Sequence, residues 1–195
     1  MLKKFLFIFI PLAILTMPNV SYSSVVGIWS VKGIITENVR VTGAGESTVQ
    51  LRGRDVFTFY KDRRFISLDG IRGKWSQKRS NFSVLLNKSD IRSLFYSMAN
   101  DYGLNVLSFN VPSAYISGKA SSSRITGTMV MEMQGDAYAF NGNVLTLYAK
   151  ATMSFSGKKT ANTARLFSVP QTESKLTNLI RIMVRSFIEE AEVSR

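Results

Sequence analysis

The stretch VLTLYAKATMSFS, residues 144–156, decides the fold, because polar and apolar side chains alternate along its length. Leu145, Leu147, Ala149, Ala151, Met153 and Phe155 fall on one face of an extended chain, and mostly polar side chains fall on the other. A period of two residues is that of a β-strand with one buried face. At a rise of about 3.3 Å per residue, the stretch reaches roughly 43 Å. A strand of this length, buried on one side only, is expected to curl around a barrel.

Shorter runs on both sides of this stretch repeat the alternation. They predict strands at 25–35, 56–60, 64–68, 73–78, 81–86, 104–111, 114–120, 124–134 and 138–140. The connections are short and polar, and Asp69-Gly70 is a turn signal between tightly paired strands. Sequential strands joined in this way predict a mainly β protein, an antiparallel meander that closes into a barrel or a strongly curved sheet.

Two segments show helical spacing instead. Ile91, Leu94, Phe95, Met98 and Tyr102 predict an inserted helix over about 89–102, with Ser89 as its N-cap. Near the end of the chain, a wider apolar stripe predicts an amphipathic helix over about 173–192. We expect this last helix to pack on the barrel wall; a membrane interface and a partner protein are the alternatives.

The first 23 residues have the composition of a secretory signal peptide. Lys3 and Lys4 precede the eleven residues 5–15, none of which has a polar side chain. A membrane-spanning helix needs about 20 such residues, so this segment is too short. Ser21 and Ser23 place small residues before a cleavage site after Ser23. We therefore expect an exported protein, periplasmic or secreted, with residues 24–195 as a single β-rich domain.

The chain contains no cysteine and no histidine. This excludes disulfides, histidine- or cysteine-based catalysis, and most zinc, copper, haem and iron–sulfur sites. The thirteen Asp and Glu residues are scattered along the sequence without a cluster. We expect a protein that is not an enzyme and that carries neither a metal nor a cofactor.

The sequence is strongly basic. Of 25 Lys and Arg residues, two lie in the signal peptide, which leaves 23 against 13 acids, a net charge of +10 for the mature chain. Within the basic segment 52–92, the two-residue spacing predicts that Arg52 and Arg54, and likewise Arg72, Lys74 and Lys78, share a strand face. These five residues are the candidate contacts for an anionic surface. A solvated outer face that deters edge-to-edge aggregation is the alternative interpretation.

Gly27-Ile28-Trp29, at the start of the first mature strand, resembles the Gly-x-Trp opening of lipocalin-like (calycin-type) proteins. The resemblance implies an antiparallel barrel with an external C-terminal helix and an interior that binds a small apolar molecule. Met129, Met131 and Met133 share a strand face and would form an adaptable wall of such a pocket. Trp29, Leu147 and Phe155 complete the candidate ligand-binding set.

Two functions follow. The leading hypothesis is a non-enzymatic exported protein that binds a lipid or another small apolar ligand inside its barrel. The alternative is a basic cell-envelope structural or interaction protein that binds anionic surfaces such as lipopolysaccharide, with peripheral membrane contact. An outer-membrane barrel is not expected, because charged residues occupy the positions that would face lipid. No nucleic-acid-binding motif accompanies the charge, so no nucleic acid partner is expected.

Overall fold

The computed structural model describes residues 24–42, 45–101, 105–138 and 142–162. The predicted signal peptide and the predicted C-terminal helix lie outside the described residues, and the single-domain organisation stays a prediction. Among the described residues, no helix is both long enough and apolar enough to cross a membrane.

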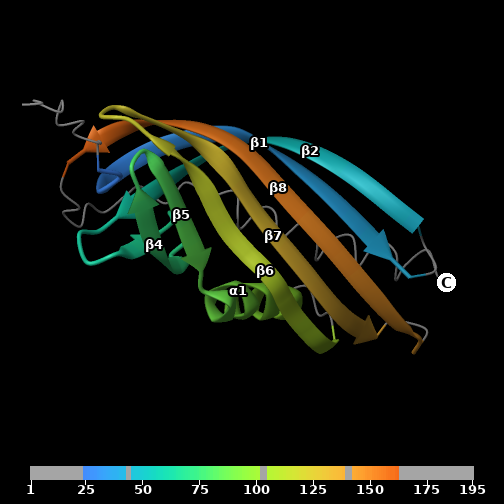
Figure 1. The fold of residues 1–195 in the computed structure, drawn as a ribbon. Helices are drawn as coiled ribbons and strands as arrows, with labels where there is room; N and C mark the ends of the chain where they lie inside the picture. The colour runs from blue at the N-terminus through green and yellow to red at the C-terminus, as the bar shows by residue number, and fades with distance from the viewer. Residues whose placement is uncertain (1–23, 43–44, 102–104, 139–141, 163–195) are drawn as a thin grey trace, which may run out of the picture.

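Eight antiparallel strands follow one another around a ring-like sheet, and β8 pairs with β1 to close it (Figure 1). The elements are β1 (Gly27–Val41), β2 (Gly45–Phe59), β3 (Arg64–Ile66), β4 (Arg72–Lys78), β5 (Asn81–Leu86), α1 (Lys88–Asp101), β6 (Val106–Ala120), β7 (Arg124–Tyr138) and β8 (Val144–Ala161). The prediction of a mainly β, antiparallel meander with one inserted helix is confirmed.

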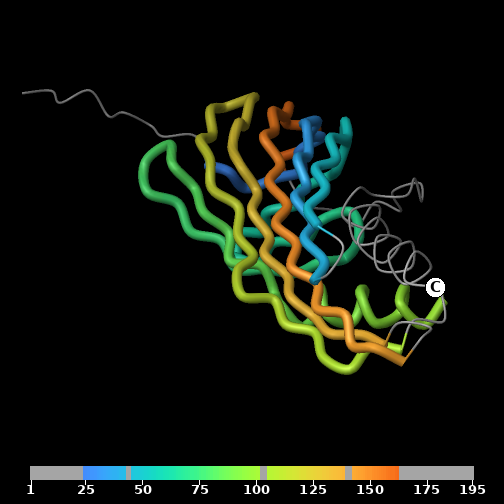
Figure 2. Tube along the Cα trace, turned by 90° about the vertical axis from the view of Figure 1, so that its right-hand side faces the viewer, coloured from blue at the N-terminus to red at the C-terminus, as the bar shows by residue number. Residues whose placement is uncertain are grey.

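The strands differ greatly in length, and this divides the sheet into two parts. β3 pairs with β2 only at Thr58 and Phe59, and β5 pairs with β6 only over residues 115–119. The closed half comprises β3, β4 and β5 with 27–34, 52–59, 115–120, 124–129 and 153–161 of the long strands. The extended half comprises the remainder of β1, β2, β6, β7 and β8, which continue past the short strands with α1 beside them (Figures 1 and 2).

Both β1 and β2 are longer than the alternation predicts. Strand β1 continues to Val41, six residues beyond the predicted end at Ile35. The reason is Glu37, a charged residue at an inward-facing position, where it is fully buried and breaks the apolar pattern. Strand β2 starts at Gly45 instead of Val56 because Asp55 is a buried acid at an inward position, and the inward positions before it are small or at most half-buried.

The predicted strands 104–111 and 114–120 form one continuous strand, β6. Its register with β7 shifts between Asn110 and Ser113, which marks a β-bulge. Pro112 lies within this bulge, where its missing N–H removes no regular ladder hydrogen bond. The proline therefore bends the strand without ending it.

The inserted helix α1 starts at Lys88 and is capped by Asn87, not by Ser89. The side-chain Oδ1 of Asn87 accepts hydrogen bonds from the Ser89 backbone N–H at 3.0 Å and from the Ser89 hydroxyl at 2.7 Å. An Asn at this position satisfies one of the free N–H groups of the first helical turn. The helix packs on β6 through Phe95, whose ring stacks on Phe109 with centroids 3.7 Å apart.

Aromatic rings fill the interior of the closed half. Phe57 makes edge-to-face contacts with Phe65 and Phe155, each with ring centroids 5.3 Å apart. Phe59 makes the same kind of contact with Phe65, Trp75 and Phe82, at 5.2, 6.1 and 5.4 Å respectively. Edge-to-face packing of large rings is favourable and leaves little free space. The closed half is therefore a packed core.

Candidate anion-binding surface

On the outer face of the closed half, six cations come from the five long strands, which are neighbours in the sheet. They are Lys32, Arg52, Arg54, Lys119, Arg124 and Lys158. All six are exposed, because each stands at an outward position of its strand. None of them forms a salt bridge within the described residues.

The strand register brings like charges face to face. Lys32 of β1 is directly opposite Arg54 of β2, and Arg124 of β7 is directly opposite Lys158 of β8. Side chains directly opposite in antiparallel strands have Cβ atoms about 5 Å apart, and like charges at that distance destabilise the sheet. No Asp or Glu occupies an outward strand position of the closed half. The potential of this face is therefore positive and uncompensated.

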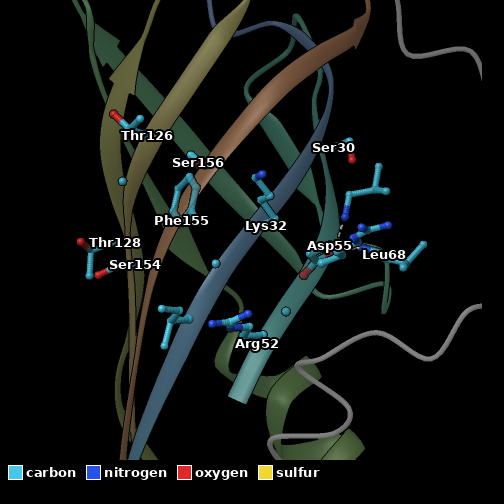
Figure 3. A pocket seen from close by; sticks show the side chains of 16 residues that line it. Ser30, Lys32, Arg52, Asp55, Leu68, Thr126, Thr128, Ser154, Phe155 and Ser156 are labelled. Atoms are coloured by element: carbon cyan, nitrogen blue, oxygen red, sulfur yellow. Dashed lines mark hydrogen bonds between the residues drawn. The ribbon is translucent and has the colours of Figure 1, made fainter. Parts of the chain in front are cut away.

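A groove of about 1230 Å³ hollows this outer face across β2, β1, β8 and β7 (Figure 3). Lys32, Arg52 and Arg54 line one side of it. The hydroxyl-bearing residues Thr126, Thr128, Ser154 and Ser156 line the other side, and Ser30 lies at the margin. Ile34 lies between the two sides and is 49% exposed. The groove thus combines a cationic wall with a hydroxyl wall.

Glycines at inward positions shape the sheet beneath the groove. Gly53, Gly33, Phe155, Gly127 and Gly118 are consecutive partners across β2, β1, β8, β7 and β6. The ring of Phe155 lies over Gly127, so that a Cβ there would come within 2.8 Å of the ring. At the same position a Cβ would meet the Ser117 carbonyl oxygen at 2.3 Å. The missing side chains let the strands bend together at this level.

Asp55 anchors the margin of the groove where β3 ends. Its Oδ1 accepts hydrogen bonds from the backbone N–H groups of Val56 at 2.6 Å and Leu68 at 3.1 Å. Burial raises the pKa of Asp55 from 3.8 to about 7; the nearby Asp69 raises it further, while the two hydrogen bonds oppose the shift. Asp55 thus satisfies two backbone donors at the edge of β2 and ties the loop after β3 to that strand.

The predicted anionic-surface residues separate into two groups. Arg52 and Arg54 lie in the groove, whereas Arg72, Lys74 and Lys78 lie on β4, beyond β3. The guanidinium of Arg72 donates to both carboxylate oxygens of Asp90 at the start of α1, which raises the pKa of Arg72 and lowers that of Asp90. Arg72 is therefore already paired, and the groove does not include the β4 cations.

Sequence reasoning missed four of the six cations: Lys32, Lys119, Arg124 and Lys158. Each stands at an outward position of a strand that was predicted or of its continuation. The alternation therefore indicated that they face outward. What it lacked was the register, which alone places Lys32 beside Arg54 and Lys158 beside Arg124.

The predicted ligand-binding residues lie in the core. Trp29, Met129, Met131, Met133, Leu147 and Phe155 are all at most 5% exposed. The indole N–H of Trp29 donates to the Val25 carbonyl at 2.7 Å, and Phe155 packs against Phe57. Met131 and Met133 stand opposite Ala151 and Ala149 of β8, where long side chains complement small ones. These side chains are part of the packing of the sheet.

Glu37 is the second buried acid, at an inward position in the extended half. It is fully buried, and neither carboxylate oxygen has a hydrogen-bond partner within the described residues. Burial raises the pKa of Glu37 from 4.5 to about 7. Among the residues described, no three acids come close enough to hold a metal ion. We therefore assign neither a metal nor a catalytic pair to the two buried carboxyls.

No protein-family model matches the chain, and no curated protein matches it in sequence. A solved structure that does match is the crystal structure of Ail, the attachment invasion locus protein of Yersinia pestis. The match covers 68% of this chain and 98% of that chain, with 9% identity and a TM-score of 0.25. Similarity this low carries no argument about activity or partners.

The lipocalin-like prediction is wrong, and so is the barrel that binds an apolar ligand. None of the comparisons points to a lipocalin. Inside the closed half, the rings of Phe57, Phe59, Phe65 and their neighbours occupy the place where such a barrel would hold its ligand. The tripeptide Gly27-Ile28-Trp29 instead opens β1, with Trp29 as a fully buried core residue.

Proposed function

We propose that this protein is a non-enzymatic component of the cell envelope that binds anionic surfaces through the outer face of its closed half. The observation that carries the proposal is the group of six cations without an acid among them. Two of its cross-strand pairs place like charges opposite each other, which costs stability unless an anion lies over them. An external anionic group supplies the missing charge.

Export supports this partner class. The signal-peptide composition of residues 1–23 directs the chain to a compartment bounded by anionic lipid head groups and phosphorylated saccharides. The net charge of +10 for the mature chain adds long-range attraction to any such surface. Binding is then electrostatic in origin, and salt weakens it, because the Debye length falls from about 30 Å at 0.01 M to about 3 Å at 1 M.

The buried carboxyls support a binding role over a catalytic one. Asp55 uses its Oδ1 to hold two backbone N–H groups. Glu37 faces inward in the extended half, three residues beyond Ile34, and does not line the groove. Burial alone raises the pKa of Glu37, and the titratable neighbour that acts on Asp55 is Asp69, a second acid that raises its pKa further, so neither carboxyl is paired with a base for general acid–base chemistry.

The test is co-sedimentation of the mature protein with vesicles of phosphatidylglycerol and phosphatidylcholine, compared with phosphatidylcholine alone, at 0.05 M and 0.5 M salt. We expect binding to the anionic vesicles only, lost at high salt. Arg52→Glu/Arg54→Glu is expected to weaken binding at least about 30-fold, because each cation near an anionic surface contributes about 1 kcal/mol.

The matched control is Arg40→Glu/Arg92→Glu, which changes the net charge by the same amount. Arg40 lies in the extended half and Arg92 on α1, so the groove is untouched. Equal loss of binding in the two double variants would show that net charge, not this face, attracts the vesicles. Binding that ignores salt would exclude the electrostatic mechanism altogether.

A further inference from the structure

We infer that the groove across β2, β1, β8 and β7 selects one class of anion, a phosphorylated saccharide such as the deacylated oligosaccharide of lipopolysaccharide. This inference rests on the proposed function, and adds that the groove recognises sugar as well as charge. The groove has two unlike walls, one cationic and one lined by hydroxyl groups.

The two walls are separated by the strand order. Arg54, Lys32, Ser156 and Thr126 form one row across four adjacent strands, and Arg52, Ile34, Ser154 and Thr128 form the next. With strands about 4.8 Å apart, the cations of β2 and the hydroxyls of β8 are separated by about 10 Å, whereas Lys32 of β1 is directly opposite Ser156. A phosphate held by Arg52 and Arg54 therefore does not reach the hydroxyls of β8 and β7, whereas a saccharide of two or more rings attached to it does.

The hydroxyl wall is free to bind. The side chains of Thr126, Thr128, Ser154 and Ser156 make no hydrogen bond within the described residues. Elsewhere on the sheet some outward hydroxyls are engaged, such as those of Ser76 and Ser83, which bond to each other at 2.9 Å. Hydroxyls donate and accept, and so they complement the hydroxyl groups of a sugar.

The middle of the groove suits a sugar ring. Ile34 is 49% exposed between the two walls, and its side chain offers an apolar surface to the C–H face of a ring. The volume of about 1230 Å³ exceeds the usual range of small-molecule pockets, which is about 300–1,000 Å³. An oligosaccharide fits this size better than an isolated phosphate or a single head group.

The experiment is isothermal titration of the mature protein with deacylated lipopolysaccharide, with the same saccharide after removal of its phosphates, and with inorganic phosphate. We expect saturable binding of the phosphorylated saccharide, at least tenfold weaker binding without the phosphates, and at least tenfold weaker binding of inorganic phosphate. Ser154→Ala/Ser156→Ala is expected to weaken saccharide binding about tenfold, as for two neutral hydrogen bonds. Its matched control, Ser76→Ala/Ser83→Ala, is expected to change nothing.

The vesicle assay separates the two claims. Ser154→Ala/Ser156→Ala keeps every cation, so its binding to phosphatidylglycerol vesicles is expected to equal that of the wild type. If that variant also binds the saccharide as wild type does, or if inorganic phosphate binds as tightly as the saccharide, the groove recognises charge alone. The present inference is then overturned while the proposed function stands. Loss of vesicle binding by the wild type at low salt would overturn the proposed function itself.

Discussion

The two halves of the sheet treat charge on their outer faces in opposite ways. In the extended half, Arg40 stands opposite Glu46 with Nε and Oε1 3.9 Å apart, and Lys150 stands opposite Glu132 with Nζ and Oε1 3.0 Å apart. The pairing with Lys150 and the Ser113 hydroxyl lowers the pKa of Glu132. In the closed half, Arg72 of β4 is paired with Asp90, but on the long strands cations face cations. The extended half neutralises the charges of its facing pairs, and the long strands of the closed half leave theirs for an external partner.

The inner faces differ as well. Large rings fill the closed half, whereas β7 and β8 of the extended half pair methionines with alanines. A rigid aromatic core beneath the cations fixes the strand register and holds like charges together. The half with the aromatic core is therefore the one that carries the uncompensated charge, and its packing can offset the cost of a binding surface.

The largest expected effect is the loss of stability when an aromatic ring is removed from the interior of either half. Phe59→Ala is expected to lower the free energy of unfolding by about 3–5 kcal/mol, since the ring contacts Phe65, Trp75 and Phe82 and leaves a cavity. Phe109→Ala in the extended half should lower it less, because that ring stacks on one side, against α1. Urea denaturation followed by tryptophan fluorescence measures both. A Phe109→Ala loss as large as that of Phe59→Ala would contradict the ranking.

The next largest effect is a dependence of the free energy of unfolding on pH, which is caused by Glu37 in the extended half and Asp55 in the closed half. The folded-state pKa of Glu37 and that of Asp55 are each about 7, raised from 4.5 and 3.8. The folded chain therefore binds more protons than the unfolded chain between these values. The added stability is complete below about pH 4 and is lost as the pH rises through 7. From pH 5 to pH 8 we expect a loss on the order of 2–3 kcal/mol per carboxyl.

Replacing each buried acid by its amide shows how much of this loss of stability comes from each half. Glu37→Gln should remove the share of the extended half, and Asp55→Asn that of the closed half, in denaturation series from pH 5 to pH 8. Each amide stays neutral throughout, so each variant should show a flatter profile than the wild type. An unchanged profile in Glu37→Gln would mean that Glu37 is ionised in the fold at neutral pH.

Removing the Asp55 side chain is expected to cost about 1–3 kcal/mol, because the N–H groups of Val56 and Leu68 lose their acceptor. Asp55→Asn is the informative companion, since its Oδ1 accepts the same two bonds. We expect thermal denaturation at pH 5, where the Asp55 carboxyl is protonated in the fold, to rank wild type and Asp55→Asn close together, with Asp55→Ala well below. If Asn and Ala cost the same, the hydrogen bonds are not what Asp55 contributes.

The alternation in the sequence was enough to predict the meander, because each strand buries one face. It predicted β5 with the same first and last residues as the structure, and it predicted the start of α1 one residue late. It ended β1 early at Ile35, since Glu37 is a buried acid at an inward position, and it began β2 late, since Asp55 is another and the inward positions before it are small or at most half-buried. A pattern based on apolar residues has no means of recognising such positions.

The candidate site was predictable only in part. Arg52 and Arg54 share a face of β2 because they are two residues apart, and this local spacing was sufficient. Their partner Lys32 comes from another strand, and its place is set by a register that long-range pairing determines. The tripeptide at Gly27 gave no such information, and the lipocalin-like interpretation built on it was wrong.

The most direct test of the account is Lys32→Glu, measured for both stability and vesicle binding. The substitution converts the like-charge pair with Arg54 into an ion pair, as in the extended half. We predict that the free energy of unfolding rises by about 0.2–1 kcal/mol, while binding to anionic vesicles weakens at least about fivefold. A variant that is no more stable and binds as the wild type does would contradict the claim that this face holds its charge for an anionic partner.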